Sequence, residues 1–357
     1  MKALHVYDTI DRPEAEIVRG LSERGVDVSV FCKPDALNKP LVEGYAKEVL
    51  PLTCSSKLDM NAVRTLRSYL RQQPVDIIHA FTGRTVAVSL IASSGIKPSP
   101  KVIAYRGAVG NVKWYDPTSW LSFLHPRVSK IICVSKAVYE DLKKSGASKE
   151  KLLQLYKGHR VEWYDTLPGI SRSDFSIPET DVVIGCVANM RRTKGADNLL
   201  RAVAKLPSLE NVSVLLVGEV RDDEIYRLAE QEPLKGKVHF AGFRKDAFLC
   251  PKLFDVFVMP SRDREGLPKG VIEAMAQSVP VVVTNVGGMP ELVREGIDGF
   301  VVKDGDIQQM TSAIAKLLES EELRKSCGAS ARQRISTDFC VDTSIEKTQS
   351  TYSELAA

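Results

Sequence analysis

The sequence predicts an α/β protein with two domains, each a parallel β-sheet covered by helices on both faces. Short runs rich in Val and Ile alternate with amphipathic stretches along almost the whole chain. This alternation stops once, close to residue 160, and then begins again. The chain has 357 residues, which is long enough for two domains that each bury a core.

The first half contains seven runs that we predict to be strands, because each is short, β-rich and bounded by turn-forming residues. They span 3–7, 26–32, 47–52, 76–81, 101–105, 130–134 and 152–156. We assign residues 1–160 to the first domain. The next stretch, 161–180, mixes Pro, Gly, Ser and aromatic residues without periodicity, and we interpret it as a hinge.

A second series of strands and helices follows and defines the second domain, residues 181–337. The predicted strands span 182–187, 212–217, 237–242, 255–259 and 281–284, and the predicted helices span 307–320, 321–335 and 341–355. In such parallel sheets the ligand loops lie at the carboxyl ends of the strands. No GxGxxG follows any predicted strand, which argues against a nicotinamide or flavin cofactor.

Composition and charge exclude several classes of protein. The net charge is only +4, and no nucleic-acid-binding motif accompanies it, so we expect no nucleic-acid partner. Seven cysteines without a CxxC predict reduced thiols, which are typical of the cytoplasm. No apolar run reaches the length of a signal peptide or a membrane span. We therefore expect a cytoplasmic protein that would reach lipid-linked material from the inner face of the membrane.

Two glutamates, Glu265 and Glu273, are separated by seven residues between a predicted strand and the first turns of a helix. The start of a helix offers backbone N–H groups and the positive end of a dipole to phosphate oxygens. Gly266 and Gly270 let a ligand come close to the backbone. The amides around Leu267, Pro268 and Lys269 are thus a predicted phosphate site. One turn further on, the Glu273 carboxylate can accept two hydrogen bonds from a ribose diol.

This segment resembles the family 4 glycosyltransferases of the GT-B fold. The resemblance rests on Glu265, Glu273, the sequence AMA at 274–276, the strand PVVV at 280–283, and GG-x-PE at 287–291. It implies two Rossmann-like domains with a cleft between them, an acceptor-side first domain and a second domain that binds a nucleotide-sugar. It also implies that the last helix, 338–357, packs back on the first domain.

The loop after the strand at 182–187 resembles the family segment that holds the donor diphosphate. Lys194 matches the family lysine before Gly195 at a helix start, and the usual family arginine falls on Asn189. Arg191 or Arg192 could supply the missing charge from two or three residues further on. Phe243, after the strand at 237–242, falls where relatives line the base pocket. Uridine is the favoured base and guanosine the next.

On the acceptor side the sequence departs from the family pattern. The turn after the first strand, 8–13, contains no glycine, and Arg106 occupies the position of a common family histidine. An arginine cannot act as a base near neutral pH, but it binds phosphate or carboxylate well. We therefore expect either an anionic acceptor or an additional clamp on the donor. Thr82 and Arg84 are further cleft candidates.

One segment of the first domain, 111–130, interleaves aromatic and basic residues. Such a mixture is found at membrane surfaces and in acceptor pockets that stack on sugars. Ordinary helix packing explains the apolar residues equally well, so a peripheral membrane contact is one of three interpretations. His79, within the strand at 76–81, is best explained as a core histidine.

The resemblance implies hexosyl transfer from a nucleotide diphosphate sugar to a hydroxyl, with retention at the anomeric carbon. Lys194 would stabilise the leaving diphosphate and Glu265 the sugar, and no Asp-x-Asp is present to hold a metal. We expect no cofactor besides the cosubstrate. The acceptor would be a glycan or a lipid-linked molecule of cell-envelope polysaccharide or lipopolysaccharide synthesis. A nucleotide-sugar epimerase, a two-lobed sugar-binding protein and a glycosidase remain as alternatives.

Overall fold

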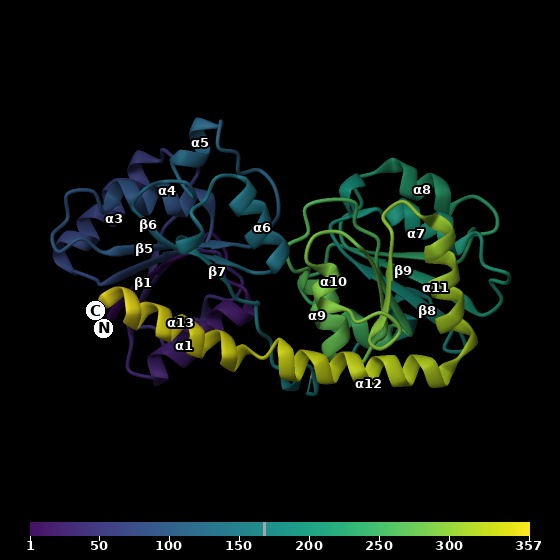
Figure 1. Cartoon of the computed structure of the whole chain (residues 1–357). Coiled ribbons are helices and arrows are strands. Elements are labelled where there is room, and N and C mark those ends of the chain that lie inside the picture. The colour runs from purple at the N-terminus through teal and green to yellow at the C-terminus, as the bar shows by residue number, and fades with distance from the viewer. Residues whose placement is uncertain (167–168) are drawn as a thin grey trace. The chain divides into compact units, whose positions relative to one another are not determined.

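The computed structural model describes residues 1–166 and 169–357 and divides into two compact units (Figure 1). Unit 1 comprises Met1–Gly158 and Cys340–Ala357, and unit 2 comprises His159–Phe339. Each unit is an α/β body with its own parallel sheet, so the predicted fold class is confirmed. The segment interpreted as a hinge, 161–180, includes 167–168, which lie outside the described residues.

Unit 1 contains a seven-stranded parallel sheet in the order β3-β2-β1-β4-β5-β6-β7. Its strands are β1 (Lys2–Val6), β2 (Asp27–Cys32), β3 (Glu48–Pro51), β4 (Ile77–Ala80), β5 (Lys101–Arg106), β6 (Val128–Cys133) and β7 (Leu152–Gln154). Its helices are α1 (Arg12–Glu23), α2 (Pro40–Glu43), α3 (Met60–Gln72), α4 (Gly83–Ala92), α5 (Pro117–Trp120), α6 (Lys136–Lys144) and α13 (Val341–Ala356). Because helices cover both faces, the central strand β4 is buried along its whole length.

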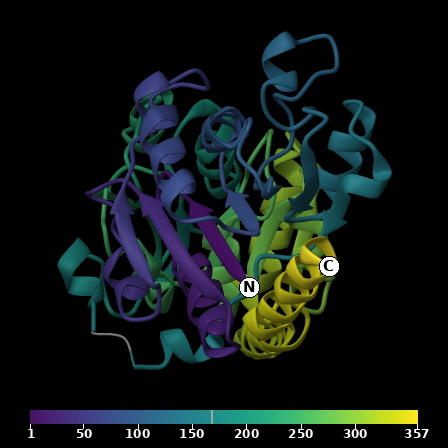
Figure 2. The ribbon, with the colours of Figure 1, turned by 90° about the vertical axis from the view of Figure 1, so that its left-hand side faces the viewer.

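The C-terminal helix α13 packs beside α1 in unit 1 (Figures 1 and 2). The contact is close because α1 presents Gly20, where a Cβ atom would stand 2.5 Å from Ile345 Cδ1. The Tyr352 hydroxyl also lies 2.8 Å from His5 Nε2 on β1 and 2.7 Å from His79 Nδ1 on β4. All three side chains are buried, as expected for His79. Residues distant in sequence thus form one core.

Unit 2 contains a six-stranded parallel sheet in the order β10-β9-β8-β11-β12-β13. Its strands are β8 (Val182–Val187), β9 (Val212–Val217), β10 (Val238–Gly242), β11 (Val256–Met259), β12 (Val281–Thr284) and β13 (Gly299–Val302). Its α-helices are α7 (Ala196–Val203), α8 (Asp223–Ala229), α9 (Lys269–Ala276), α10 (Met289–Leu292), α11 (Ile307–Glu319) and α12 (Glu321–Asp338). The edge strand β13 is not among the strands predicted from the sequence.

Candidate donor site

The candidate site lies in unit 2, where two neighbouring strands end. β8 and β11 pair in parallel at the centre of the sheet, at the point where the strand order changes direction. At such a switch point the loops after the two strands diverge and leave room for a ligand. Here those loops are 188–195, after β8, and 260–268, after β11. They carry most of the residues predicted to bind the donor.

Lys194 and Glu265 meet at this point. Lys194 Nζ lies 2.5 Å from Glu265 Oε1, although 71 residues separate them in sequence. The Ser261 hydroxyl donates to the same oxygen at 2.5 Å. Glu265 is buried, whereas the Lys194 side chain is 30% exposed. An ammonium group has three N–H donors, so Lys194 can hold Glu265 and a ligand oxygen together.

Two glycines allow the loops to approach this closely. Gly195 has φ +67°, and a Cβ atom there would stand 2.0 Å from the Pro260 carbonyl oxygen. Gly287 has φ +57°, and its Cβ would stand 1.8 Å from the Glu265 carbonyl oxygen. A side chain at either position would be strained in conformation and would also collide with backbone. The GG-x-PE part of the motif therefore packs directly against the loop that carries Glu265.

The helix α9 begins at the same edge of the sheet. Its N-cap residue is Pro268, whose side chain cannot accept a hydrogen bond, so the first turn is not capped as most helices are. Gly266, Leu267 and Pro268 are all buried. Glu273 is also buried, on the second turn, and Lys269 Nζ lies 3.6 Å from its Oε1. The Glu273 carboxylate therefore lies one turn along α9 from the helix start, beside the Lys269 ammonium group.

Three further predicted donor residues lie on loops at this carboxyl edge. Asn189 and Arg192 are exposed in the loop after β8, and Arg192 opens a short 3₁₀ helix that ends at Lys194. Phe243 directly follows β10 and is 76% exposed, which is unusual for a large aromatic side chain. The positions are compatible with diphosphate and base contacts, but Arg192 also borders a separate pocket of about 350 Å³ that includes neither Lys194 nor Glu265.

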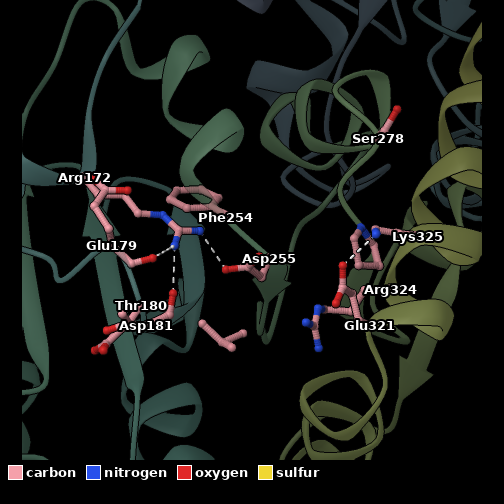
Figure 3. A pocket seen from close by; sticks show the side chains of 12 residues that line it. Arg172, Glu179, Thr180, Asp181, Phe254, Asp255, Ser278, Glu321, Arg324 and Lys325 are labelled. Atoms are coloured by element: carbon pink, nitrogen blue, oxygen red, sulfur yellow. Dashed lines mark hydrogen bonds and ion pairs between the residues drawn. The ribbon is translucent and has the colours of Figure 1, made fainter.

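A pocket of about 360 Å³ lies at the opposite edge of this sheet (Figure 3). It is bordered by Asp181, Asp255 and Pro280, each of which directly precedes a strand. Arg172, one of the two arginines that line it, is already engaged, since it donates to the Asp181 carbonyl and to Asp255 Oδ2, both at 2.8 Å. We interpret this pocket as the place where Arg172 attaches its segment to the sheet by hydrogen bonds, and not as the donor site.

The predicted acceptor-side residues all lie in unit 1. Thr82 is the N-cap of α4: its hydroxyl accepts from Thr85 N and donates to Asp8 Oδ2 at 2.9 Å. Arg84 Nη2 donates to the same oxygen at 2.9 Å, and its side chain is 45% exposed. Asp8 and Thr82 follow β1 and β4, the switch point of this sheet. The two predicted residues are thus brought together by a buried aspartate that the sequence analysis did not identify.

Arg106 ends β5 in the same unit and is partly buried. Its Nη2 donates to the Gly110 carbonyl, and its guanidinium lies 5.1 Å from the centre of the Phe123 ring. Burial lowers the pKa of Arg106 from its ordinary value. The Nε atom is buried and has no hydrogen-bond partner among the described residues. Arg106 therefore helps to hold its own loop and keeps an unused donor.

Sequence reasoning did not identify Ser261 and Arg262 as site residues. Ser261 shares Oε1 of Glu265 with Lys194, and Arg262 donates to the loop that carries Lys194. Their spacing from Glu265 carries no recognisable pattern, because the contacts depend on how two loops fold. Arg264, in the same loop, has a positive φ of +62°. This backbone conformation is uncommon for a residue other than glycine and is often found at functional sites, but it cannot be read from the sequence.

Comparison with known proteins places the chain in a family. Residues 170–334 match the family model described as Glycosyl transferases group 1, and residues 15–163 match the model described as Glycosyltransferase Family 4. The lipopolysaccharide core biosynthesis glycosyltransferase LpsE of Rhizobium meliloti (strain 1021) is 26% identical over 311 residues, which is 86% of this chain and 85% of LpsE. An Escherichia coli UDP-Gal:alpha-D-GlcNAc-diphosphoundecaprenol alpha-1,3-galactosyltransferase is 26% identical over 364 residues, which is 92% of this chain and 89% of the galactosyltransferase.

Solved structures share the fold. The Anabaena protein HepE in complex with UDP superimposes with a TM-score of 0.80 at 22% identity, covering 99% of this chain and 100% of HepE. WaaG, a glycosyltransferase involved in lipopolysaccharide biosynthesis, gives 0.74 at 18% identity and covers 99% of both chains. The protein is a glycosyltransferase with the GT-B fold. It belongs to the family 4 glycosyltransferases, as the resemblance implied.

Within 1–166 and 169–357, no group of His, Cys, Asp and Glu side chains is arranged to hold a metal ion. The same ranges contain no helix with both the length and the apolar composition that crossing a bilayer requires.

Proposed function

We propose that this glycosyltransferase moves a hexosyl group from a UDP-sugar, or next from a GDP-sugar, to a hydroxyl of a glycan or glycolipid, with retention at the anomeric carbon. The names of the relatives support this proposal. LpsE and WaaG are named for lipopolysaccharide synthesis, the Escherichia coli relative for a UDP-Gal donor and a lipid-linked acceptor, and HepE was solved with UDP. We therefore assign the chain to cell-envelope polysaccharide synthesis.

The observation that carries the proposal is the 2.5 Å contact between Lys194 and Glu265 at the switch point of unit 2. A lysine beside an uncapped helix start gives a compact positive site for a diphosphate. Glu265, held by Lys194 and Ser261, would bind sugar hydroxyls on the far side of the phosphates. Glu273 would bind the ribose diol and the exposed Phe243 would stack on the base. The remaining donor contacts come from Asn189, Arg192, Gly266, Leu267, Pro268 and Lys269.

The difficult step in such a transfer is departure of the diphosphate while the sugar carbon becomes positively charged. Lys194 and the first amides of α9 would stabilise the negative charge that grows on the phosphates. Glu265 would offset the positive charge on the ring. As the acceptor hydroxyl attacks, its oxygen forms the new bond to the anomeric carbon and the phosphate oxygen takes its proton. This arrangement supplies the charge from protein groups, so we propose that no metal is required.

We propose that the acceptor binds unit 1 through an anionic group. Arg84 is held by Asp8 and keeps half of its side chain exposed at the switch point of the unit 1 sheet. A guanidinium fixed by one carboxylate still presents donors to a second oxyanion. Arg106, with its unused Nε donor, is the last residue of β5, the next strand in the sheet.

We also propose a peripheral membrane contact through the segment that contains α5, which projects from the rest of unit 1 (Figures 1 and 2). Trp114, Tyr115 and Trp120 are 65%, 61% and 45% exposed. Lys113 Nζ lies 5.5 Å from the centre of the Tyr115 ring. Exposed aromatic rings beside a lysine suit the interface of an anionic bilayer.

The proposed function is tested by following nucleoside diphosphate release from UDP-sugars and GDP-sugars in the presence and absence of a lipid-linked glycan, with each assay run both with and without EDTA. A transferase releases UDP mainly when acceptor is present, and the anomeric configuration of the product is read by NMR. An epimerase would convert the donor without acceptor, and a binding protein would leave it intact. Either of these outcomes, or complete loss of activity in EDTA, contradicts the corresponding part of the proposal.

A further inference from the structure

Arg262 connects the two loops of the donor site, yet it has no part in the proposed chemistry. It follows Ser261 in the loop after β11. Its backbone N–H donates to the Thr193 carbonyl at 2.8 Å, and its Nη1 donates to the Arg192 carbonyl at 2.9 Å. These two carbonyls directly precede Lys194. One arginine therefore holds the turn that presents the lysine by both its backbone and its side chain.

The same guanidinium also reaches the helix that follows the turn. Nη2 donates to Asp197 Oδ2 and to Asn198 Oδ1, both at 2.7 Å. Asp197 and Asn198 are buried in the first turn of α7. Burial alone would raise the pKa of Asp197, but hydrogen bonds and charge from Arg262 and Arg201 outweigh it, so the pKa is lowered and the carboxylate stays ionised.

These contacts lie on both sides of Lys194 along the chain: two carbonyls before it and two side chains after it. The residue before Arg262 is Ser261, which donates to Glu265. Arg262 is thus connected to the loop of Lys194 and, through its neighbour, to the carboxylate that Lys194 contacts. A lysine could not replace it, because only the planar guanidinium reaches several acceptors in fixed directions.

We propose that Arg262 is a positioning residue that fixes Lys194 in the geometry for binding the donor diphosphate. The inference rests on the proposed role of Lys194. A small displacement of a binding group is sufficient to lose much of its contribution, and a change of about 1 Å can cost on the order of 10²-fold in rate. Arg262 itself need not touch the donor.

A double-mutant cycle on UDP binding tests this role. Titration calorimetry with UDP as the probe is performed on the full chain, on Arg262→Gln, on Lys194→Ala and on the double variant. If Arg262 acts through Lys194, Arg262→Gln weakens UDP binding about tenfold in the native background and less than about twofold in the Lys194→Ala background. Arg262→Lys keeps the positive charge but not the planar guanidinium, so it should lose nearly as much UDP affinity as Arg262→Gln.

Arg201→Gln is the matched control. Arg201 also donates to Asp197, but its other bond goes to Glu224 at 2.6 Å and not to the loop of Lys194. We expect this variant to bind UDP as the native protein does. If Arg262→Gln does not fold, as judged by thermal unfolding, the cycle is run with Arg262→Lys.

The outcomes separate the inference from the proposed function. Equal losses in the two backgrounds, or no loss at all, would overturn the positioning role while leaving Lys194 as a diphosphate ligand. If Lys194→Ala alone binds UDP as tightly as the native chain, the assignment of Lys194 is wrong and the positioning role of Arg262 falls with it. A loss confined to the background that contains Lys194 supports the inference.

Discussion

At the scale of single residues, the proposed donor site depends on a lysine and a glutamate that share one short contact. Glu265 is buried with two donors on one oxygen, so its position is fixed before any ligand arrives. Lys194 is less buried, so its ammonium group can contact a ligand as well as Glu265. Preorganised charge of this kind is effective because it does not have to reorient as the reaction proceeds.

Replacing Lys194 by Ala is expected to reduce kcat/KM for the donor at least about 100-fold, or about 3 kcal/mol, because the charge opposite the leaving diphosphate is lost. Steady-state kinetics with the native donor measure this effect. Lys325→Ala is the control, since Lys325 lies at the opposite edge of the unit 2 sheet (Figure 3). Full activity in the Lys194 variant would show that the diphosphate binds elsewhere.

Replacing Glu273 by Ala is expected to raise KM for the donor about tenfold with little change in kcat, because hydrogen bonds to the ribose are present in both ground and transition states. Kinetics over a range of donor concentrations separate the two parameters. Glu321→Ala, on the exposed start of α12, should change neither. A fall in kcat at constant KM would instead assign Glu273 a role in the chemical step.

The sequence predicted Glu265 and Glu273 from their spacing at a helix start and Lys194 from the family resemblance, and the structure brings Lys194 and Glu265 into contact. Ser261, Arg262 and Asp8 could not be found in the same way. Each acts through a side chain or backbone atom of a loop that is distant in sequence, and no local pattern encodes such a contact. Thr82, predicted to be a cleft residue, uses its hydroxyl to cap the start of α4.

At the scale of elements, the central strands were predictable because a parallel sheet covered on both faces reads as continuous apolar runs. β8, β9 and β12 have the predicted bounds. β13 was missed because its four residues, GFVV, follow a glycine-containing turn and lie at the sheet edge. α12 extends three residues beyond its predicted end, to Asp338.

The helix α13 owes its place to a buried polar contact as well as to apolar packing. Replacing Tyr352 by Phe removes the hydroxyl that both His5 and His79 contact and leaves two buried ring nitrogens without that partner. We expect the free energy of unfolding of unit 1 to fall by about 1–3 kcal/mol. Urea denaturation followed by circular dichroism measures it. Unchanged stability would mean that the histidines find other partners.

At the scale of the whole molecule, the chain forms two units with separate cores, and the first is completed by the last helix in the sequence. The amphipathic periodicity of 341–355 predicted a helix, but periodicity does not say which sheet a helix covers. That assignment came from the family resemblance. Physically it follows from Gly20, which admits Ile345, and from the two histidines that face Tyr352.

The buried histidines make unit 1 sensitive to acid. Burial lowers the pKa of His5 to about 3 and lowers that of His79 well below its ordinary value. In the unfolded chain both would titrate near 6.5. The unfolded state therefore binds more protons than the folded state between about pH 6.5 and 3. The contribution of these histidines to the free energy of unfolding is fully present above pH 6.5 and falls as the pH is lowered through that window.

We expect His5 to account for a loss of about 2 kcal/mol between pH 7 and pH 5, and His79 to add to this loss in the same direction. Burial raises the pKa of Glu14. Protonation in acid removes this buried charge, so Glu14 opposes the loss of stability that the histidines cause. Hydrogen exchange at the two pH values should show β1 and β4 losing protection before β8 and β11. Equal loss of protection in both units would contradict the assignment to the histidines.

The most direct test is a crystal structure of the protein with UDP. The diphosphate oxygens should lie within about 3 Å of Lys194 Nζ and of the backbone N–H groups that begin α9, with the ribose hydroxyls on Glu273. A diphosphate bound away from the loops 188–195 and 260–268, for example against Arg172 at the other edge of the sheet, would contradict the proposed site.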